Sequence, residues 1–219
     1  SLSETEDKDW INNWKAYFKP FRASKDIVIK PTWEDYEKEK ETDILIEIDP
    51  GIAFGTGSHE TTRLCIQALD TYVKDGDSIL DVGCGSGILS IAGIKLGAGH
   101  ATAIDIDEVA VKVAAENFAV NKISPSQYSL YDGNLISNAF LKVRAGTNHD
   151  IVVANILADV IIPLTAVIGQ HLKKGGIYIT SGILNTKEEE VREALTENNF
   201  EILSVEHMKE WCCFITTYR

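Results

Sequence analysis

From residue 59 onwards, apolar and polar positions alternate in blocks whose lengths predict alternating strands and helices. Short apolar runs bounded by Gly, Asp or Asn indicate strands at 78–82, 101–105, 127–131, 150–154, 177–180, 201–207 and 212–217. Apolar residues spaced three and four apart indicate helices at 59–72, 88–96, 108–120, 157–172 and 187–198. Alternation of this kind is typical of an α/β protein whose parallel sheet carries helices on both faces.

The last two predicted strands are separated only by residues 208–211. A connection this short cannot hold a crossover, so we expect these strands to pair as an antiparallel hairpin at one end of a seven-stranded, mostly parallel sheet. In an open sheet of this kind, ligands bind beyond the carboxyl ends of the strands. Candidate chemistry is therefore to be sought at those ends.

Residues 1–50 are more irregular than the rest of the chain. A short helix is expected there, with Trp10 and Trp14 on one face as a packing stripe, followed by short strands at 26–29 and 44–48. We expect this segment to be a linker before a main domain at 51–219.

Composition and charge narrow the function classes. The chain has 219 residues, 44% of them hydrophobic and 25% charged, as in globular proteins, and its apolar runs are far shorter than a membrane span. The net charge of −12 argues against a broad nucleic-acid surface, which needs clustered Lys and Arg. The four Cys lack metal-type spacing, so a reduced, cytoplasmic protein without a metal is the simpler interpretation. The chain opens on an acidic, polar stretch, so we expect no signal peptide. Because the initiator Met is missing, we expect a fragment or a processed chain.

A glycine loop follows the first strand of the predicted sheet, with glycines at positions 83, 85 and 87. Glycines let a backbone approach a ligand closely, and the helix behind them offers unpaired N–H groups. The spacing is not the Gly-x-Gly-x-x-Gly of dinucleotide-binding loops, because residue 88 is Ile. Taken alone, the loop is a weak indication, and an ordinary strand–helix turn is an alternative.

The ends of the next two strands carry polar side chains. Asp105 stands about 20 residues after Gly83, where an acid can accept both hydroxyls of a ribose. Asp107 is the better cap for the following helix, which leaves Asp105 free for a ligand. Asn134 could meet an adenine edge or simply form a turn. Loop and acid together indicate a nucleoside-containing cofactor, and the glycine spacing favours S-adenosylmethionine (SAM) over NAD.

Residues 49–62 read DPGIAFGTGSHETT. With the residues at 81–87, 105–107 and 155–159, this segment closely resembles the ribosomal protein L-eleven methyltransferases, the PrmA family, and the likeness extends over nearly the whole chain. The FGTGxH part is far more specific than the glycine loop, which very many SAM-dependent methyltransferases share. The resemblance implies a Rossmann-like class I SAM-dependent methyltransferase domain at 51–219. It also implies a cytoplasmic enzyme that methylates lysine and α-amino groups of a large-subunit ribosomal protein.

The resemblance assigns cofactor contacts to several positions of this chain. With the loop and turn arguments above, the predicted cofactor-binding residues are Thr62, Gly83, Gly85, Asp105, Asn134 and Asn155. Asn155 is also the predicted catalytic residue, because its carboxamide oxygen can accept a hydrogen bond from an amine and aim the lone pair without acting as a base. The alternative is that Asn155 caps the next helix. We expect His59 to orient its loop, and Cys84 to be a small filler.

Two departures from the family pattern bear on function. Family members normally carry a small N-terminal domain that grips the substrate, and this chain begins where the connecting segment is expected, so we expect weak substrate recognition. They commonly have Pro where this chain has Glu60, which we expect to affect only helix entry. Other functions stay open: a methyltransferase acting on another protein, a nucleic acid or a small amine, an NAD-linked oxidoreductase, or a non-catalytic SAM-binding module.

Overall fold

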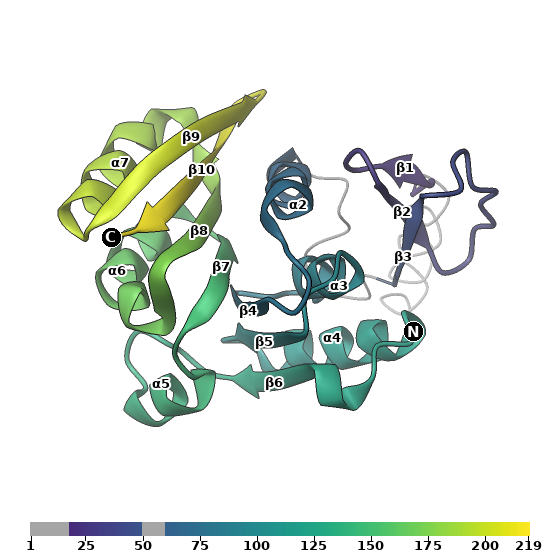
Figure 1. Ribbon diagram of the computed structural model, residues 1–219, viewed down its shortest axis with the longest axis horizontal. Coiled ribbons are helices and arrows are strands. Elements are labelled where there is room, and N and C mark those ends of the chain that lie inside the picture. The colour runs from purple at the N-terminus through teal and green to yellow at the C-terminus, as the bar shows by residue number, and fades with distance from the viewer. Residues whose placement is uncertain (1–17, 50–59) are drawn as a thin grey trace, which may run out of the picture.

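The computed structural model describes residues 18–49 and 60–219, which form two β-sheets with helices packed against them (Figure 1). The larger sheet has seven strands in the order β6-β5-β4-β7-β8-β10-β9. In chain order, its strands are β4 Ser78–Val82, β5 His100–Asp105, β6 Tyr128–Asp132, β7 His149–Asn155, β8 Leu172–Leu184, β9 Phe200–Met208 and β10 Trp211–Tyr218. Neighbouring strands from β6 to β8 are parallel, and β10 is antiparallel to both β8 and β9. The predicted mostly parallel sheet with a C-terminal hairpin is confirmed.

Helices cover both faces of this sheet. One face carries α2 Glu60–Tyr72, α3 Ile88–Lys95 and α4 Glu108–Val120, and the other carries α5 Ala139–Ala145, α6 Ala158–Ile168 and α7 Glu188–Glu197. Successive strand residues point to opposite faces, so Ile79 of β4 joins the core under α2–α4, whereas Leu80 joins the core under α5–α7. Burial on both faces is why the central strands read as unbroken apolar runs.

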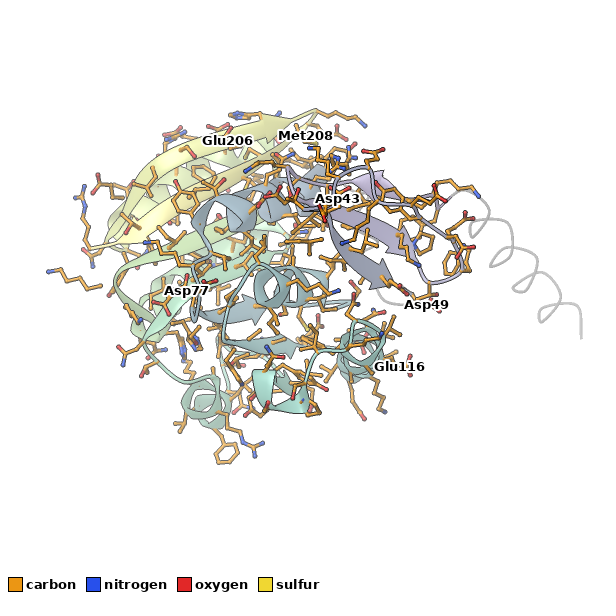
Figure 2. The ribbon with its side chains drawn as sticks, turned by 45° about the vertical axis from the view of Figure 1, so that its right-hand side comes forward. Asp43, Asp49, Asp77, Glu116, Glu206 and Met208 are labelled. Carbon is orange, nitrogen blue, oxygen red and sulfur yellow. The ribbon has the colours of Figure 1, made fainter. Side chains whose placement is uncertain are left out.

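The smaller sheet is built by β1 Phe21–Arg22, β2 Ile27–Pro31 and β3 Ile44–Ile48, in that order. Its buried isoleucines, such as Ile29 and Ile46, belong to the same core as α2 and α3. Helix α3 is therefore enclosed between the two sheets, which explains why it is apolar around its whole circumference. The guanidinium of Arg22 binds the carboxylate of Asp43, labelled in Figure 2, through two contacts of 2.8 and 3.0 Å. The domain boundary at residue 50 stays a prediction.

Some elements differ from the sequence-based expectation. The strand predicted at 177–180 extends over all of β8, because β7 and β10 pair with it along its length. The helix predicted at 157–172 ends at Ile168 and continues as the short 3-10 turn η2 Gly169–His171. Two further 3-10 turns are η1 Pro125–Gln127 and η3 Asn185–Lys187. Helix α5 and strand β1 were not predicted.

Several predictions fall outside the described residues. The helix predicted near Trp10 and Trp14, the residue His59 and most of the segment at 49–62 lie there. Within the described ranges, no helix combines the length and the apolar character that crossing a bilayer requires.

Candidate cofactor and active site

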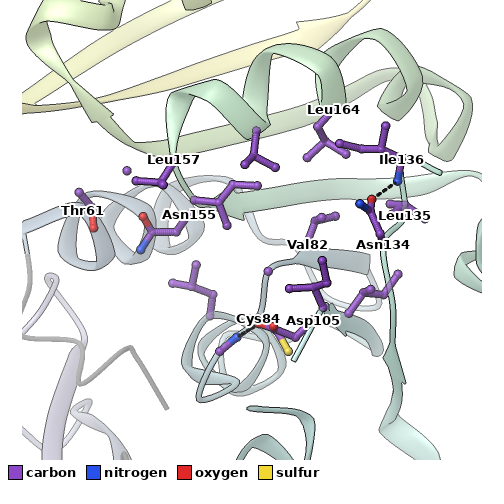
Figure 3. Close-up of a pocket in the computed structure, with 18 of the residues that line it drawn as sticks. Thr61, Val82, Cys84, Asp105, Asn134, Leu135, Ile136, Asn155, Leu157 and Leu164 are labelled. Atoms are coloured by element: carbon purple, nitrogen blue, oxygen red, sulfur yellow. Dashed lines mark hydrogen bonds between the residues drawn. The ribbon is translucent and has the colours of Figure 1, made fainter. Parts of the chain in front are cut away.

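A cavity of about 630 Å³ opens at the carboxyl ends of β4, β5, β6 and β7 (Figure 3). This is the edge of the sheet at which ligands of open parallel sheets are expected. Every residue predicted to bind the cofactor lines this cavity: Thr62, Gly83, Gly85, Asp105, Asn134 and Asn155. The structure therefore brings the predicted set together, and their individual roles stay predictions.

The glycine loop has a backbone that other residues would strain. Gly83, Gly85 and Gly87 have φ angles of 75°, 52° and 80°, in the region where side chains are disfavoured. A Cβ atom on Gly83 would lie 2.4 Å from Cγ2 of Ile156, which is closer than two carbons can approach. The N–H of Gly83 donates to the carbonyl of Ile104 over 2.8 Å, which ties the loop to β5. The loop thus presents bare backbone to the cavity.

Asp105, at the end of β5, is held by two backbone N–H groups. Its Oδ2 accepts from Gly85 over 2.8 Å and its Oδ1 accepts from Asp107 over 2.9 Å. As expected, Asp105 is not the cap of α4. Its carboxylate has two backbone partners, but each oxygen keeps a second lone pair for a hydroxyl donor, so contact with a ribose stays a prediction. Asp107 caps α4 as predicted, since its carboxylate accepts from the N–H of Val109 over 2.9 Å.

Asn134 follows β6 and forms the turn that was one of its two predicted roles. Its Oδ1 accepts from the N–H of Ile136 over 2.9 Å, as the dashed line in Figure 3 shows. Its Nδ2 has no hydrogen bond to another described residue, and the side chain lines the cavity. The turn therefore fixes the side chain and leaves its Nδ2 donor available for a ligand. Contact between Asn134 and an adenine stays a prediction.

Asn155 ends β7, and its side chain lines the cavity near Thr61 (Figure 3). Its Nδ2 donates to Oγ1 of Thr62, a fully buried residue of α2, over 3.2 Å. The alternative that Asn155 caps the next helix is wrong, because the residue at the N-cap of α6 is Leu157 and no side chain caps it. The bond to Thr62 orients the carboxamide, and its oxygen carries no hydrogen bond from the described residues.

A buried carboxyl group lies behind the glycine loop. Oδ2 of Asp81, in β4, accepts from both Oγ and N–H of Ser90, over 2.7 and 3.2 Å, whereas Oδ1 has no partner among the described residues. Because Gly87 at the N-cap of α3 has no side chain, Asp81 supplies the acceptor for the first turn of that helix. Complete burial raises the pKa of Asp81 to about 7.

The cavity wall is mainly apolar. Among the described residues that line it, Asp105 is the one with a charged side chain, and the apolar side chains include Val82, Ile104, Leu135, Leu157 and Leu164. Burial, together with Asp81 and Asp105, raises the pKa of the Cys84 thiol well above its ordinary value, so this Cys is a poor nucleophile and acts as filler. Within the described ranges, no group of three His, Cys, Asp or Glu side chains could hold a metal ion.

These features fit SAM. An acid at the end of the second strand suits ribose hydroxyls, a bare glycine backbone suits a close ligand, and apolar walls suit an adenine ring. A side chain at residue 83 would collide with Ile156, which also lines the cavity.

Sequence reasoning missed two features near the β9–β10 hairpin. Trp211, the first residue of β10, lines the cavity, and only the order of strands in the sheet reveals this. Glu60 does more than shape the entry of α2, because its carboxylate pairs with Nζ of Lys209 in the turn between β9 and β10. No local pattern links positions so far apart in the chain.

Comparison with known proteins places these observations in a family. The family model described as "Ribosomal protein L11 methyltransferase (PrmA)" matches residues 1–219. The ribosomal protein L11 methyltransferase of Lachnoclostridium phytofermentans is 54% identical over 98% of this chain and 69% of its own length. That of Lachnospira eligens is 52% identical over 95% of this chain and 66% of its own length. The chain thus spans about two thirds of the curated relatives it matches.

Solved structures agree in fold. The crystal structure of ribosomal protein L11 methylase from Lactobacillus delbrueckii subsp. bulgaricus has a TM-score of 0.83 and 32% identity, covering 92% of this chain and all of that one. A TehB-like SAM-dependent methyltransferase from Corynebacterium glutamicum, at 17% identity over 71% of this chain and 87% of that one, has a TM-score of 0.57 and shows the fold alone. By its whole length and by its Rossmann-type fold, the chain belongs to the ribosomal protein L11 methyltransferase (PrmA) family.

Proposed function

We propose that this protein transfers methyl groups from SAM to amines of ribosomal protein L11, both the α-amine and lysine side chains. The observation that carries the proposal is the placement of Asn155, at the end of β7, in the wall of a cavity whose other described polar groups suit SAM. The names of the relatives supply the substrate protein. A ribosomal protein as substrate supports a cytoplasmic reaction.

Asp105, the glycine loop and Asn134 would hold the nucleoside part of the cofactor at the ends of β4, β5 and β6. When bound, SAM supplies an electrophilic methyl carbon, which passes to the nitrogen lone pair of the amine while the carbon–sulfur bond electrons stay on sulfur. The protein's part in such a displacement is to orient and to exclude water.

Asn155 is the residue that orients the amine in this proposal. Its Nδ2 is engaged by Thr62, so the carboxamide plane is fixed and its oxygen can accept an N–H hydrogen bond from the incoming amine. A carboxamide cannot remove a proton at neutral pH, so the amine has to arrive as the free base. An α-amine, with a reference pKa near ~7.7–8.0, meets this condition more readily than lysine near ~10.4. The apolar wall lowers the pKa of an amine that enters it.

The test is mass spectrometry of ribosomal protein L11 after incubation with this protein and SAM. We expect mass increments of whole methyl groups, located by digestion at the N-terminus and at lysines. Because weak substrate recognition is expected, L11 is supplied at a concentration at which calorimetry shows it bound; if both SAM and L11 are bound but L11 keeps its mass, the proposed substrate is wrong.

Two variants separate binding from chemistry in the same assay. Asn155→Ala should lower single-turnover methyl transfer by about 10²-fold at saturating SAM, because orientation of the reactant is lost. Asp105→Ala should instead weaken SAM binding by roughly 2–4 kcal/mol, because hydrogen bonds to a charged group are lost. Equal single-turnover rates for Asn155→Ala and the wild type would contradict the role of Asn155.

A further inference from the structure

The order of strands divides the cavity along its length. The polar groups that suit a nucleoside, Asp105 and Asn134, lie at the ends of β5 and β6, on one side of the central strand β4. Asn155 lies on the other side of β4, at the end of β7. Beyond β7 come β8 and β10, which contribute Gly182 and Trp211 to the cavity wall. The wall at Trp211 is thus separated from the nucleoside side by Asn155.

Register pairs connect Trp211 to Asn155 across the sheet. Asn155 of β7 pairs with Ser181 of β8, and Trp211 of β10 pairs with Leu184, three residues further along β8. The N–H of Ile156 donates to the carbonyl of Ser181 over 3.1 Å, which holds the two strand ends together. Both residues therefore stand at the same edge of the sheet, on adjoining parts of one wall.

The turn that carries Trp211 is fixed from two directions. Asn185 donates through its backbone N–H to the carbonyl of Glu210 over 2.8 Å and through Nδ2 to the carbonyl of Lys209 over 3.0 Å. On the opposite side, Nζ of Lys209 pairs with the carboxylate of Glu60 in α2. Hairpin turns are usually among the mobile parts of a protein, but this one is held against two neighbouring elements. The backbone that leads into Trp211 is therefore held in a defined place.

We propose that Trp211 is a substrate-contacting residue that packs against the alkyl stem of the lysine whose amine reaches Asn155. The inference rests on the proposed function and adds its specificity for lysine side chains. A flat aromatic ring offers a large apolar surface to a chain of methylene groups while the polar end of that chain stays in reach of other groups. Leu157, which is 68% exposed and lines the same cavity, extends the apolar surface beside Asn155.

The test compares two peptides that differ in the amine they offer. One has a single lysine and an acetylated N-terminus, and the other has a free N-terminus and no lysine. In the full chain, Trp211→Ala should lower kcat/KM for the lysine peptide by about 10- to 100-fold, the range for losing part of an apolar subsite. The lysine-free peptide should keep about its wild-type kcat/KM, because its amine has no stem to pack.

Further variants and a binding measurement exclude a merely structural effect. Trp211→Phe should restore most of the lysine activity, and Trp33→Ala, which removes an indole packed against Phe18 outside the cavity, should leave the preference unchanged. Calorimetry should show wild-type SAM affinity in Trp211→Ala and weaker binding of the lysine peptide in the presence of S-adenosylhomocysteine.

The outcomes distinguish the inference from the function on which it rests. The inference is overturned, and the proposed function stands, if Trp211→Ala has the wild-type kcat/KM for both peptides. The same conclusion follows if the variant loses activity on both peptides together with its SAM affinity. If the wild-type protein binds SAM but methylates neither peptide and leaves ribosomal protein L11 unmodified, the proposed function itself is overturned, and the inference with it.

Discussion

At the scale of single residues, the most unusual group is the carboxyl of Asp81. It is fully buried, and one of its oxygens has no partner among the described residues, so its charged form is poorly solvated. The structure still gains from it, because the other oxygen accepts two bonds from Ser90 and anchors the start of α3 behind the glycine loop. Asp81 therefore affects both the stability of the folded protein and the position of the glycine loop that lines the cavity.

The raised pKa predicts a pH-dependent stability. Between the ordinary aspartate pKa and about 7, the folded protein keeps a proton on Asp81 that the unfolded chain has lost. Stability therefore falls as pH rises through this window and levels off above it. Asp81→Asn should remove this slope. Relative to the wild type, its free energy of unfolding should rise by roughly 2–4 kcal/mol between pH 5 and pH 8, bounded by about 1.4 kcal/mol per pH unit.

Denaturant unfolding of both proteins across that range checks the prediction. The buried histidines His149 and His171 have lowered pKa values, so they destabilise the folded protein as pH falls, the opposite direction to Asp81. Their contribution cancels in the difference between variant and wild type. Parallel pH curves for the two proteins would show that Asp81 does not titrate in this window.

At the scale of elements, the junction of β4 and α3 depends on the absence of a side chain at residue 83. Gly83→Ala would place a methyl group against Ile156 at a φ of 75°, so the loop would have to move. We expect a loss of about 1–3 kcal/mol in the free energy of unfolding and a marked loss of SAM affinity.

Adding Ile156→Ala to that variant tests the cause. Removing the colliding Cγ2 should recover part of the stability. The strain from the positive φ of residue 83 should remain. Calorimetry and denaturant unfolding of the single and double variants measure both effects. If Ile156→Ala recovers nothing, the contact with Ile156 is not what excludes a side chain at this position.

The elements also show what a sequence can predict. Strands such as β4 and β7 were found because burial on both faces gives unbroken apolar runs. The end of a parallel strand indicated Asp105, whereas the choice of Asn155 as a site residue rather than a helix cap depended on the resemblance to the family. Helix α5 was missed because Phe140 and Val143 on it are exposed while Leu141 and Ala145 are buried, a pattern without a clear apolar face. Trp211 was missed as a cavity residue because its position depends on β10 lying beside β8, which no local pattern encodes.

At the scale of the whole molecule, the two sheets share one core. Ile46 of β3 is fully buried in the cluster that also holds residues of α2, α3 and the larger sheet. Ile46→Ala should therefore destabilise the entire protein by about 2–5 kcal/mol, through lost burial and the cavity that remains.

The shape of the unfolding curve tests this view of the core. We expect a single transition whose midpoint shifts, followed equally by Trp fluorescence and by far-ultraviolet circular dichroism. Two separate transitions, with only the first affected by Ile46→Ala, would show that residues 18–49 form an independent unit. That result would instead support the predicted boundary at residue 50.

The strand order along the cavity has a consequence for protein engineering. The groups suited to the methyl donor come from β4, β5 and β6, whereas the wall beyond Asn155 comes from β8 and β10. On the proposal that this wall contacts the acceptor, randomising Leu157 and Trp211, which both line the cavity, would alter the acceptor side and leave the donor side untouched. A library of this kind could select enzymes for bulkier amines without first having to rebuild their affinity for the donor.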